Sequence, residues 1–156
     1  MKKYPWQLTE IPKSKIKRFG EGGRRKKSVS KKKPLFSIIT VVYNGVDSVR
    51  EAVKSVLSQD YKNIEYIVID GGSTDGTIDV IKEYQDKISV FISEADKGIY
   101  DALNKGIAHS SGDVVAILHS DDQFCNTCIV SDMMHKMDKS NAEFCFSDMV
   151  IVDNLS

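Results

Sequence analysis

Short β-branched apolar runs that alternate with helical patterns constrain the fold of this chain more than any other feature. Runs of this kind are typical of strands that are buried on both faces of a parallel sheet. Four of them precede segments with helical periodicity, at residues 35–42, 64–69, 88–92 and 114–118. A fifth run, at residues 143–152, ends the series. This alternation predicts an α/β fold with a mainly parallel sheet and right-handed crossovers.

Apolar residues at helical spacing between these runs predict four helices. Ser48 and Glu51 have the spacing of a capping box, in which both side chains bond to backbone N–H groups at the start of a helix. Met133, Met134 and Met137 share one face of the last helix, and we interpret them as residues that fill gaps in the core. Residues 35–156 are therefore expected to form one domain. The four helices are expected around residues 49–57, 78–84, 99–107 and 129–137.

The first 34 residues differ in charge from the rest of the chain. They carry 13 basic and 2 acidic residues, whereas residues 35–156 carry 9 basic and 20 acidic residues. Because no hydrophobic period is present, we expect residues 1–34 to be a basic arm that is mostly disordered. Its two candidate partners are an anionic membrane surface and nucleic acid. The acidic remainder of the chain makes nucleic acid the weaker candidate.

Three cysteines and a charged N-terminus indicate the compartment. An odd cysteine count without an apolar signal segment points to the cytoplasm, with peripheral binding at the inner face of the membrane as an extension of that prediction. Cys125 and Cys128 have the spacing of zinc and redox sites, and Cys145 and His135 would complete a set of four ligands on paper. We favour the plainer interpretation that this pair consists of small buried residues at a helix start.

Acidic residues follow the predicted strands at their carboxyl ends, where ligands bind in open parallel sheets. Carboxylates are present at three of the four ends, and such a rim suits a hard divalent cation that bridges to a diphosphate. The loops G-x-x-x-x-G-K-[ST] and G-x-G-x-x-G, which bind phosphates directly, are absent from the expected places. The alternative interpretation makes these carboxylates turn formers or helix caps. The four strand ends are residues 43–44, 70–73, 94–97 and 120–122.

Five motifs in order resemble glycosyltransferase family 2, over residues 35 to about 150. The resemblance implies a GT-A fold, in which a Rossmann-like nucleotide-binding half joins an acceptor-binding half. It also implies transfer of a sugar from a nucleotide-diphosphate donor in polysaccharide or glycan biosynthesis, usually with inversion and with Mn²⁺ or Mg²⁺. The motifs are SIITVVYNG at 37–45, DGGSTDGT at 70–77, SEADKGIYDALNKG at 93–106, SGD at 111–113 and LHSDD at 118–122.

The resemblance assigns donor-binding roles to residues at the first three strand ends. Val41 and Tyr43 match the strand end that packs around the donor base. Asp70 matches the carboxylate that reads a uracil-type base edge, so a UDP-sugar is the favoured donor. Asp96 and Lys97 match the loop near the donor ribose and the sugar phosphate.

The resemblance also identifies an acidic pair after the fourth strand. Asp121 matches the ribose contact and Asp122 the metal ligand of the family's D-x-D-type pair. The cation would offset the charge that develops on the departing diphosphate. Relatives often have Asn where this chain has His119. The family's general base lies well downstream of this pair, so Asp148 and Asp153 come too early for that role, and we expect the base beyond residue 156.

Two functions from different classes follow from this resemblance. The first is a glycosyltransferase domain that binds a nucleotide-diphosphate sugar through a divalent metal and transfers the sugar to an acceptor hydroxyl. The second is a non-catalytic nucleotide-sugar-binding module that lacks the acceptor half. Because a candidate base and an acceptor wall are missing from the 156 residues, we expect them not to catalyse transfer by themselves.

Overall fold

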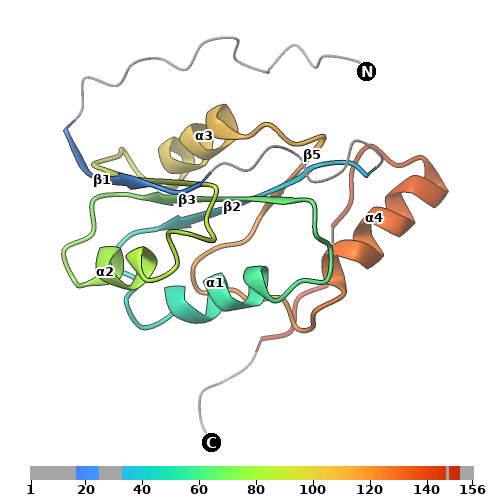
Figure 1. The fold of residues 1–156 in the computed structure, drawn as a ribbon, viewed down its shortest axis with the longest axis horizontal. Coiled ribbons are helices and arrows are strands. Elements are labelled where there is room, and N and C mark those ends of the chain that lie inside the picture. The colour runs from blue at the N-terminus through green and yellow to red at the C-terminus, as the bar shows by residue number, and fades with distance from the viewer. Residues whose placement is uncertain (1–16, 25–32, 147, 152–156) are drawn as a thin grey trace, which may run out of the picture.

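A five-stranded sheet in the order β1-β4-β3-β2-β5 organises the computed structural model (Figure 1), which describes residues 17–24, 33–146 and 148–151. Strands β2 to β5 are mutually parallel, whereas β1 runs antiparallel to β4 at one edge. The predicted α/β fold with a mainly parallel sheet is therefore confirmed. The strands are β1 Arg18–Gly22, β2 Phe36–Val42, β3 Ile64–Asp70, β4 Val90–Glu94 and β5 Val114–Ile117.

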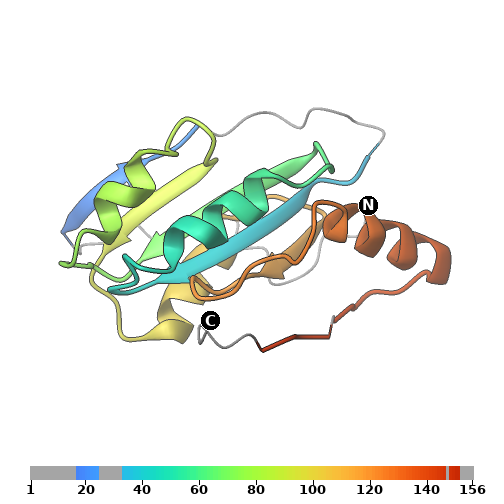
Figure 2. The same cartoon turned by 90° about the horizontal axis from the view of Figure 1, so that it is seen from below.

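Helices cover both faces of the sheet. Helices α1 and α2 lie on one face and α3 on the other, as Figures 1 and 2 show. Among the described residues, no helix combines the length and the hydropathy that crossing a bilayer requires. All four predicted helices are present. Their bounds are α1 Val49–Leu57, α2 Thr77–Lys82, α3 Ile99–His109 and α4 Ile129–Ser140.

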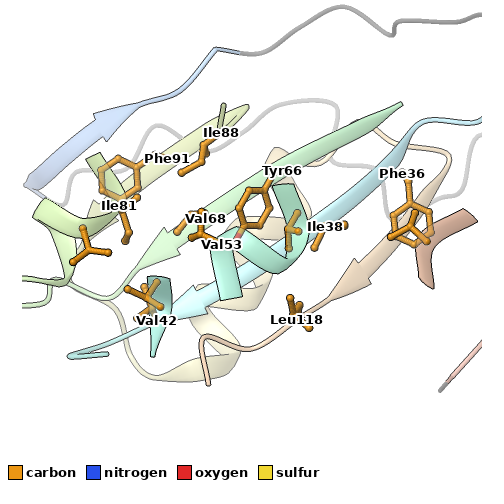
Figure 3. Packing of buried hydrophobic residues seen from close by; sticks show 14 of the residues in the cluster. Phe36, Ile38, Val42, Val53, Tyr66, Val68, Ile81, Ile88, Phe91 and Leu118 are labelled. Carbon is orange, nitrogen blue, oxygen red and sulfur yellow. The ribbon is translucent and has the colours of Figure 1, made fainter. Parts of the chain in front are cut away.

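The core consists of two apolar layers, one on each face of the sheet. Successive side chains of a strand point to opposite faces, so Ile38 and Val42 of β2 enter the layer under α1, α2 and α4, part of which Figure 3 shows. Ile39 and Val41 enter the layer under α3. Helix α3 approaches the sheet closely because Gly106 has no side chain, and a Cβ atom there would clash with Ile39.

One of the motifs of the resemblance lies at the amino end of the sheet, far from the carboxyl strand ends. The buried carboxylate of Glu65 accepts hydrogen bonds from the hydroxyls of Ser37 and Ser111, both at 2.6 Å. Asp113 Oδ2 accepts a hydrogen bond from the backbone N–H of Leu35 at 2.8 Å. The segment at 111–113 therefore closes the amino end of the sheet and has a structural role.

Strand β1 is a regular element within residues 1–34, which were expected to form a mostly disordered arm. Arg18–Gly22 is a regular strand that pairs with the edge of β4, and Figure 2 shows the two side by side. The sequence of this segment has no hydrophobic alternation that would indicate a strand. The strand forms because β4 offers it a partner. Residues 1–16 and 25–32 of the expected arm lie outside the described residues. Residues 17, 23–24 and 33–34 are described and belong to no helix or strand.

The prediction of a strand over residues 143–152 is wrong for the part of this segment that the structure describes. Residues 143–146 and 148–151 have no regular secondary structure, and the side chains of Phe144, Phe146 and Ile151 are exposed. An apolar run becomes a strand only where a neighbouring strand offers backbone hydrogen bonds. In the described sheet, this segment pairs with none of the five strands.

Two smaller expectations at helix starts also need correction. Ser48 is the N-cap of α1, but its side chain caps no N–H group and lies 3.4 Å from the carbonyl of Gly45, so the capping box is not formed. Cys128 begins α4 as expected, but it is only half-buried, and Cys125 is exposed. Desolvation, followed by a hydrogen bond to Asp132, raises the pKa of the Cys128 thiol and so disfavours a reactive thiolate.

Candidate functional site

The carboxyl ends of β2, β3, β4 and β5 bring the predicted site residues to one edge of the sheet. The loops after β3 and β4 touch, because a Cβ atom built on Gly71 would lie 2.6 Å from Oδ2 of Asp96. The loops after β2 and β5 are also adjacent, since a Cβ atom on Gly45 would lie 3.5 Å from the hydroxyl of Ser120. The structure thus joins four loops that are far apart in the sequence.

The loop after β2 is held by the loop after β3. The backbone N–H of Asn44 donates to Ser73 Oγ at 2.7 Å, and the N–H of Gly45 donates to Thr77 Oγ1 at 2.9 Å. In return, the side-chain carbonyl of Asn44 accepts from the N–H of Thr74 at 2.9 Å. The serine and threonines of the glycine-rich motif therefore position the neighbouring loop.

Asp75 completes this connection and binds the first residue of α2. Its Oδ1 accepts hydrogen bonds from the N–H of Thr77 at 3.0 Å and from the hydroxyl of the same residue at 2.5 Å. Its Oδ2 accepts from the N–H of Val46 at 3.1 Å. These bonds, that of the Thr77 hydroxyl above all, hold the pKa of the Asp75 carboxyl below its usual value.

The carboxylate of Asp70 is buried and accepts its hydrogen bonds from neighbouring residues of the protein. Its side chain is 0% exposed. Oδ2 accepts from the N–H groups of Gly72 and Ser73, each at 3.0 Å, and from the hydroxyl of Ser93 at 2.6 Å, while Oδ1 accepts from the hydroxyl of Ser73. Asp70 therefore shapes the turn after β3, as the alternative interpretation proposed. That Asp70 also reads a base edge stays a prediction.

The carboxylate of Asp96 is the more accessible of the two. Its Oδ1 accepts from the backbone N–H of Gly98 at 2.8 Å, and its Oδ2 lies over Gly71. Within the described part of the chain, no donor reaches this Oδ2. The next residue, Lys97, is exposed, and its N–H donates to Asp101 at 3.1 Å, which lowers the pKa of the Asp101 carboxyl.

Of the two residues predicted at the end of β2, one presents its side chain to the surface. Val41 is 5% exposed and packs with Ile69 and Ala102 in the layer under α3. Tyr43 is 66% exposed. The structure therefore places Val41 in the core, whereas the ring of Tyr43 is free to contact a ligand.

The acidic pair lies in a turn directly after β5. Leu118 anchors this turn in the core, and the N–H of Asp122 donates to the carbonyl of His119 at 3.1 Å. Asp121 is exposed and Asp122 half-buried, and neither carboxylate has a hydrogen bond or an ion pair with a described residue. Two unpartnered carboxylates fit a hard cation, although the described residues contain no group of three potential ligands.

Sequence reasoning missed two residues of β1 that lie near this edge. Arg18 Nε lies 3.1 Å from Glu94, which is 3% exposed and also pairs with Lys105 Nζ at 3.1 Å. Glu94 is therefore the centre of an ion-pair network and is not free at the strand end. Phe19 Cε2 lies 3.2 Å from the position of a Cβ atom on Gly72. The one sequence signal for this residue was an aromatic side chain between Arg18 and Gly20 in a basic segment.

Comparisons with known proteins identify the family of this chain. The family described as Glycosyl transferase family 2 matches residues 37–154. The chain belongs to this family. It is 38% identical over 118 residues to the Escherichia coli UDP-Glc:alpha-D-GlcNAc-diphosphoundecaprenol beta-1,3-glucosyltransferase WfaP, covering 75% of this chain and 47% of that protein.

Solved structures of glycosyltransferases have the same fold. Residues 1–349 of Staphylococcus aureus TarS in complex with UDP-GlcNAc match with a TM-score of 0.62 and 25% identity, over 69% of this chain and 32% of that fragment. The Pyrobaculum calidifontis mannosyltransferase PcManGT in complex with GDP-Man and Mn²⁺ matches with a TM-score of 0.57 and 25% identity, over 61% of this chain and 30% of that one. These likenesses confirm the GT-A fold. The chain spans less than half the length of the curated family 2 relatives that it matches.

Proposed function

We propose that this chain binds a nucleotide-diphosphate sugar, with a UDP-sugar favoured, and contributes the donor side of an inverting glycosyl transfer in polysaccharide or glycan biosynthesis. The observation that carries the proposal is the meeting at one sheet edge of an exposed ring and several unpartnered carboxylate oxygens: Tyr43, Asp96, Asp121 and Asp122. The name of WfaP includes UDP-Glc, and TarS was solved with UDP-GlcNAc, which supports a donor of this class.

The acidic pair would hold Mn²⁺ or Mg²⁺, and PcManGT was solved with Mn²⁺. Such a cation neutralises charge on the leaving diphosphate. Asp122, which is half-buried, is the proposed ligand, and the exposed Asp121 is the proposed contact to the ribose hydroxyls. Because the described residues supply few ligands, diphosphate oxygens and water would complete the coordination.

Asp96, together with Lys97, is the proposed contact to the nucleoside side of the donor. A carboxylate oxygen that has no protein donor accepts from a ribose hydroxyl or from an N–H group of a base without breaking an existing hydrogen bond. The Lys97 ammonium, which is exposed, would approach the sugar phosphate. Asp70, by contrast, would act through the turn that it organises.

The test of donor binding is calorimetry with UDP. We expect the chain to bind UDP in the presence of Mn²⁺ and to bind it much more weakly in EDTA, because the cation bridges two sets of negative charges. Uridine, which has the same base and ribose but no phosphate, is the control ligand and should show no dependence on the metal. Equal binding of UDP with and without Mn²⁺ would contradict a metal-bridged donor site.

The alternative function is nucleotide-sugar binding without transfer. Asp148 favours it, because this carboxylate is exposed in a segment without regular secondary structure, and nothing in its described surroundings fixes it as a general base. The two functions are separated by incubating the chain with nucleotide sugars and an acceptor pool, then following nucleotide release and glycan products separately. Acceptor-dependent product would establish transfer, and UDP binding without product would support the binding module.

The basic segment at residues 1–34 suggests a second partner, an anionic membrane surface at the inner face of the membrane. Its 13 basic residues would attract anionic lipid headgroups. We expect the chain to sediment with vesicles that contain phosphatidylserine and to be released by salt, while neutral vesicles and duplex DNA bind less. Stronger binding to DNA than to these vesicles would overturn this assignment.

A further inference from the structure

We propose that Phe19 of β1 stacks on the nucleobase of the donor, so that a strand preceding the family-matched region completes the donor site. This inference rests on the proposed function, since it needs a nucleotide at the carboxyl edge of the sheet. The family matches residues 37–154, and neither the motifs nor the comparisons assign a role to this phenylalanine.

The register of β1 on β4 explains why Phe19 is aimed differently from its neighbours. Arg18 pairs with Glu94 and Gly20 with Ser93, so β1 advances by two residues where β4 advances by one. Phe19 is the additional residue, which is the arrangement of a β-bulge. Bulges redirect a side chain relative to the regular alternation and are over-represented next to active sites.

This bulge sends the ring toward the loop after β3. Phe19 Cε2 lies 3.2 Å from the position that a Cβ atom of Gly72 would occupy. Gly72 has a φ of 88°, which disfavours any other residue, so the ring lies against a loop that exposes backbone without a side chain. The adjacent Gly71 lies next to Asp96 Oδ2. An aromatic ring and an unpartnered carboxylate oxygen therefore flank the same pair of glycines.

The fold holds the strand that carries this ring at three points. Arg18 pairs with the buried Glu94, Gly20 is close enough to the ring of Phe91 that a Cβ atom would lie 3.3 Å from it, and the N–H of Arg24 donates to the carbonyl of Ile88 at 2.7 Å. The side chain of Phe19 is nevertheless 56% exposed. A large apolar ring that the strand holds in place, and that stays exposed near an unpartnered carboxylate oxygen, is available to contact a ligand.

The chemistry fits a nucleobase. Every base has a π-face, so stacking on an aromatic ring adds affinity with little regard to which base is bound. The nearby carboxylate of Asp96 would supply the selectivity that stacking lacks. Phe19 should therefore increase the affinity for UDP and for CDP alike and should leave the affinity for a phosphate group unchanged.

The test is calorimetry on the full chain with Mn²⁺, using UDP, CDP and inorganic pyrophosphate as probes. Phe19→Ala should weaken the binding of UDP and of CDP by on the order of 10-fold each and should leave the binding of pyrophosphate unchanged. Phe19→Trp, which keeps an aromatic face, should restore affinity, and Phe19→Leu, which keeps apolar bulk, should not. Phe144→Ala is the matched control, because Phe144 is also an exposed phenylalanine, at 78%, and should bind all three probes like the original chain.

Three results would overturn the inference. Unchanged UDP affinity in Phe19→Ala would show that Phe19 does not contact the base, while leaving the proposed function intact. Equal losses of UDP and pyrophosphate in a variant with a lowered melting temperature would make Phe19 a purely structural residue. Failure of the original chain to bind UDP at all would remove the proposed function, and this inference with it.

Discussion

Arg18 Nε lies 3.1 Å from Oε2 of Glu94, and this ion pair joins β1 to the edge of the parallel sheet. Glu94 is buried, and its other oxygen pairs with Lys105 of α3, so one carboxylate connects β1, β4 and a helix. A buried carboxylate that loses a partner keeps its desolvation cost. The pair therefore holds in place the strand that carries Phe19.

Arg18→Ala is expected to lower the free energy of unfolding by about 1–3 kcal/mol, because it leaves one oxygen of a buried carboxylate without its donor. The measurement is urea denaturation followed by circular dichroism. Arg24→Ala is the matched control, since Arg24 pairs with Asp86 at 3.1 Å where both side chains are exposed, and such pairs contribute about 0–1 kcal/mol. Equal effects of the two substitutions would show that the Glu94 network is no stronger than a surface pair.

Asp122→Asn is expected to weaken UDP binding at least 10-fold in Mn²⁺ and to change it little in EDTA, because a neutral amide oxygen attracts a hard cation less than a carboxylate does. Titration calorimetry in the two buffers provides the measurement. Asp138→Asn, at an exposed position of α4, should behave like the original chain in both. A loss of the same size with and without metal would assign Asp122 a role other than metal binding.

Substitution of Asp70 is expected to affect stability, whereas substitution of Asp96 is expected to affect the choice of nucleotide. Asp70→Ala removes the acceptor of four hydrogen bonds and should lower the free energy of unfolding by about 1–3 kcal/mol or more. Asp96→Asn should leave stability nearly unchanged and alter the preference among UDP, CDP and GDP. Denaturation and calorimetry on both variants distinguish the two roles. A stable Asp70→Ala protein with a changed base preference would restore Asp70 as the residue that reads the base.

Asp75 is expected to make stability depend on pH in the acid range. Its folded-state pKa lies below the ordinary value of 3.8, so its contribution is present above that value and is lost as pH falls through the folded pKa. The stability difference between the original chain and Asp75→Asn should therefore be largest near neutral pH and shrink below about pH 4. Urea titrations between pH 2 and pH 7 test this. A difference that stays constant over this range would show that ionisation of Asp75 contributes nothing.

Local pattern was sufficient for the four parallel strands and the four helices of the family domain. The β-branched runs at Phe36–Val42 and Ile64–Asp70 became central strands because burial on both faces requires uninterrupted apolar residues. The carboxyl ends of those strands could also be predicted to meet, because parallel strands all end at the same edge of a sheet. The four strand ends followed from chain order, and the resemblance to the family singled out the candidate residues among and beside them.

The role of each carboxylate within that set depended on contacts between loops. Asp70 and Asp96 are similar by pattern, since each lies at or just after a strand end with a glycine one or two residues later. They differ because Ser73, Ser93 and two N–H groups fold onto Asp70, whereas Asp96 lies over the bare backbone of Gly71. Hydrogen-bond saturation is a property of the three-dimensional neighbourhood, which spacing along the chain does not encode.

The sequence by itself determined the α/β alternation, the family motifs and the edge where a ligand would bind, because these depend on residue type and order. Only the tertiary structure decided that Arg18–Gly22 is a strand and that residues 143–146 and 148–151 are not. The physical reason is the same in both cases. A strand at the edge of a sheet is stabilised by the backbone and side chains of its partner, so a weak pattern beside β4 forms a strand while a strong pattern without a neighbour stays irregular.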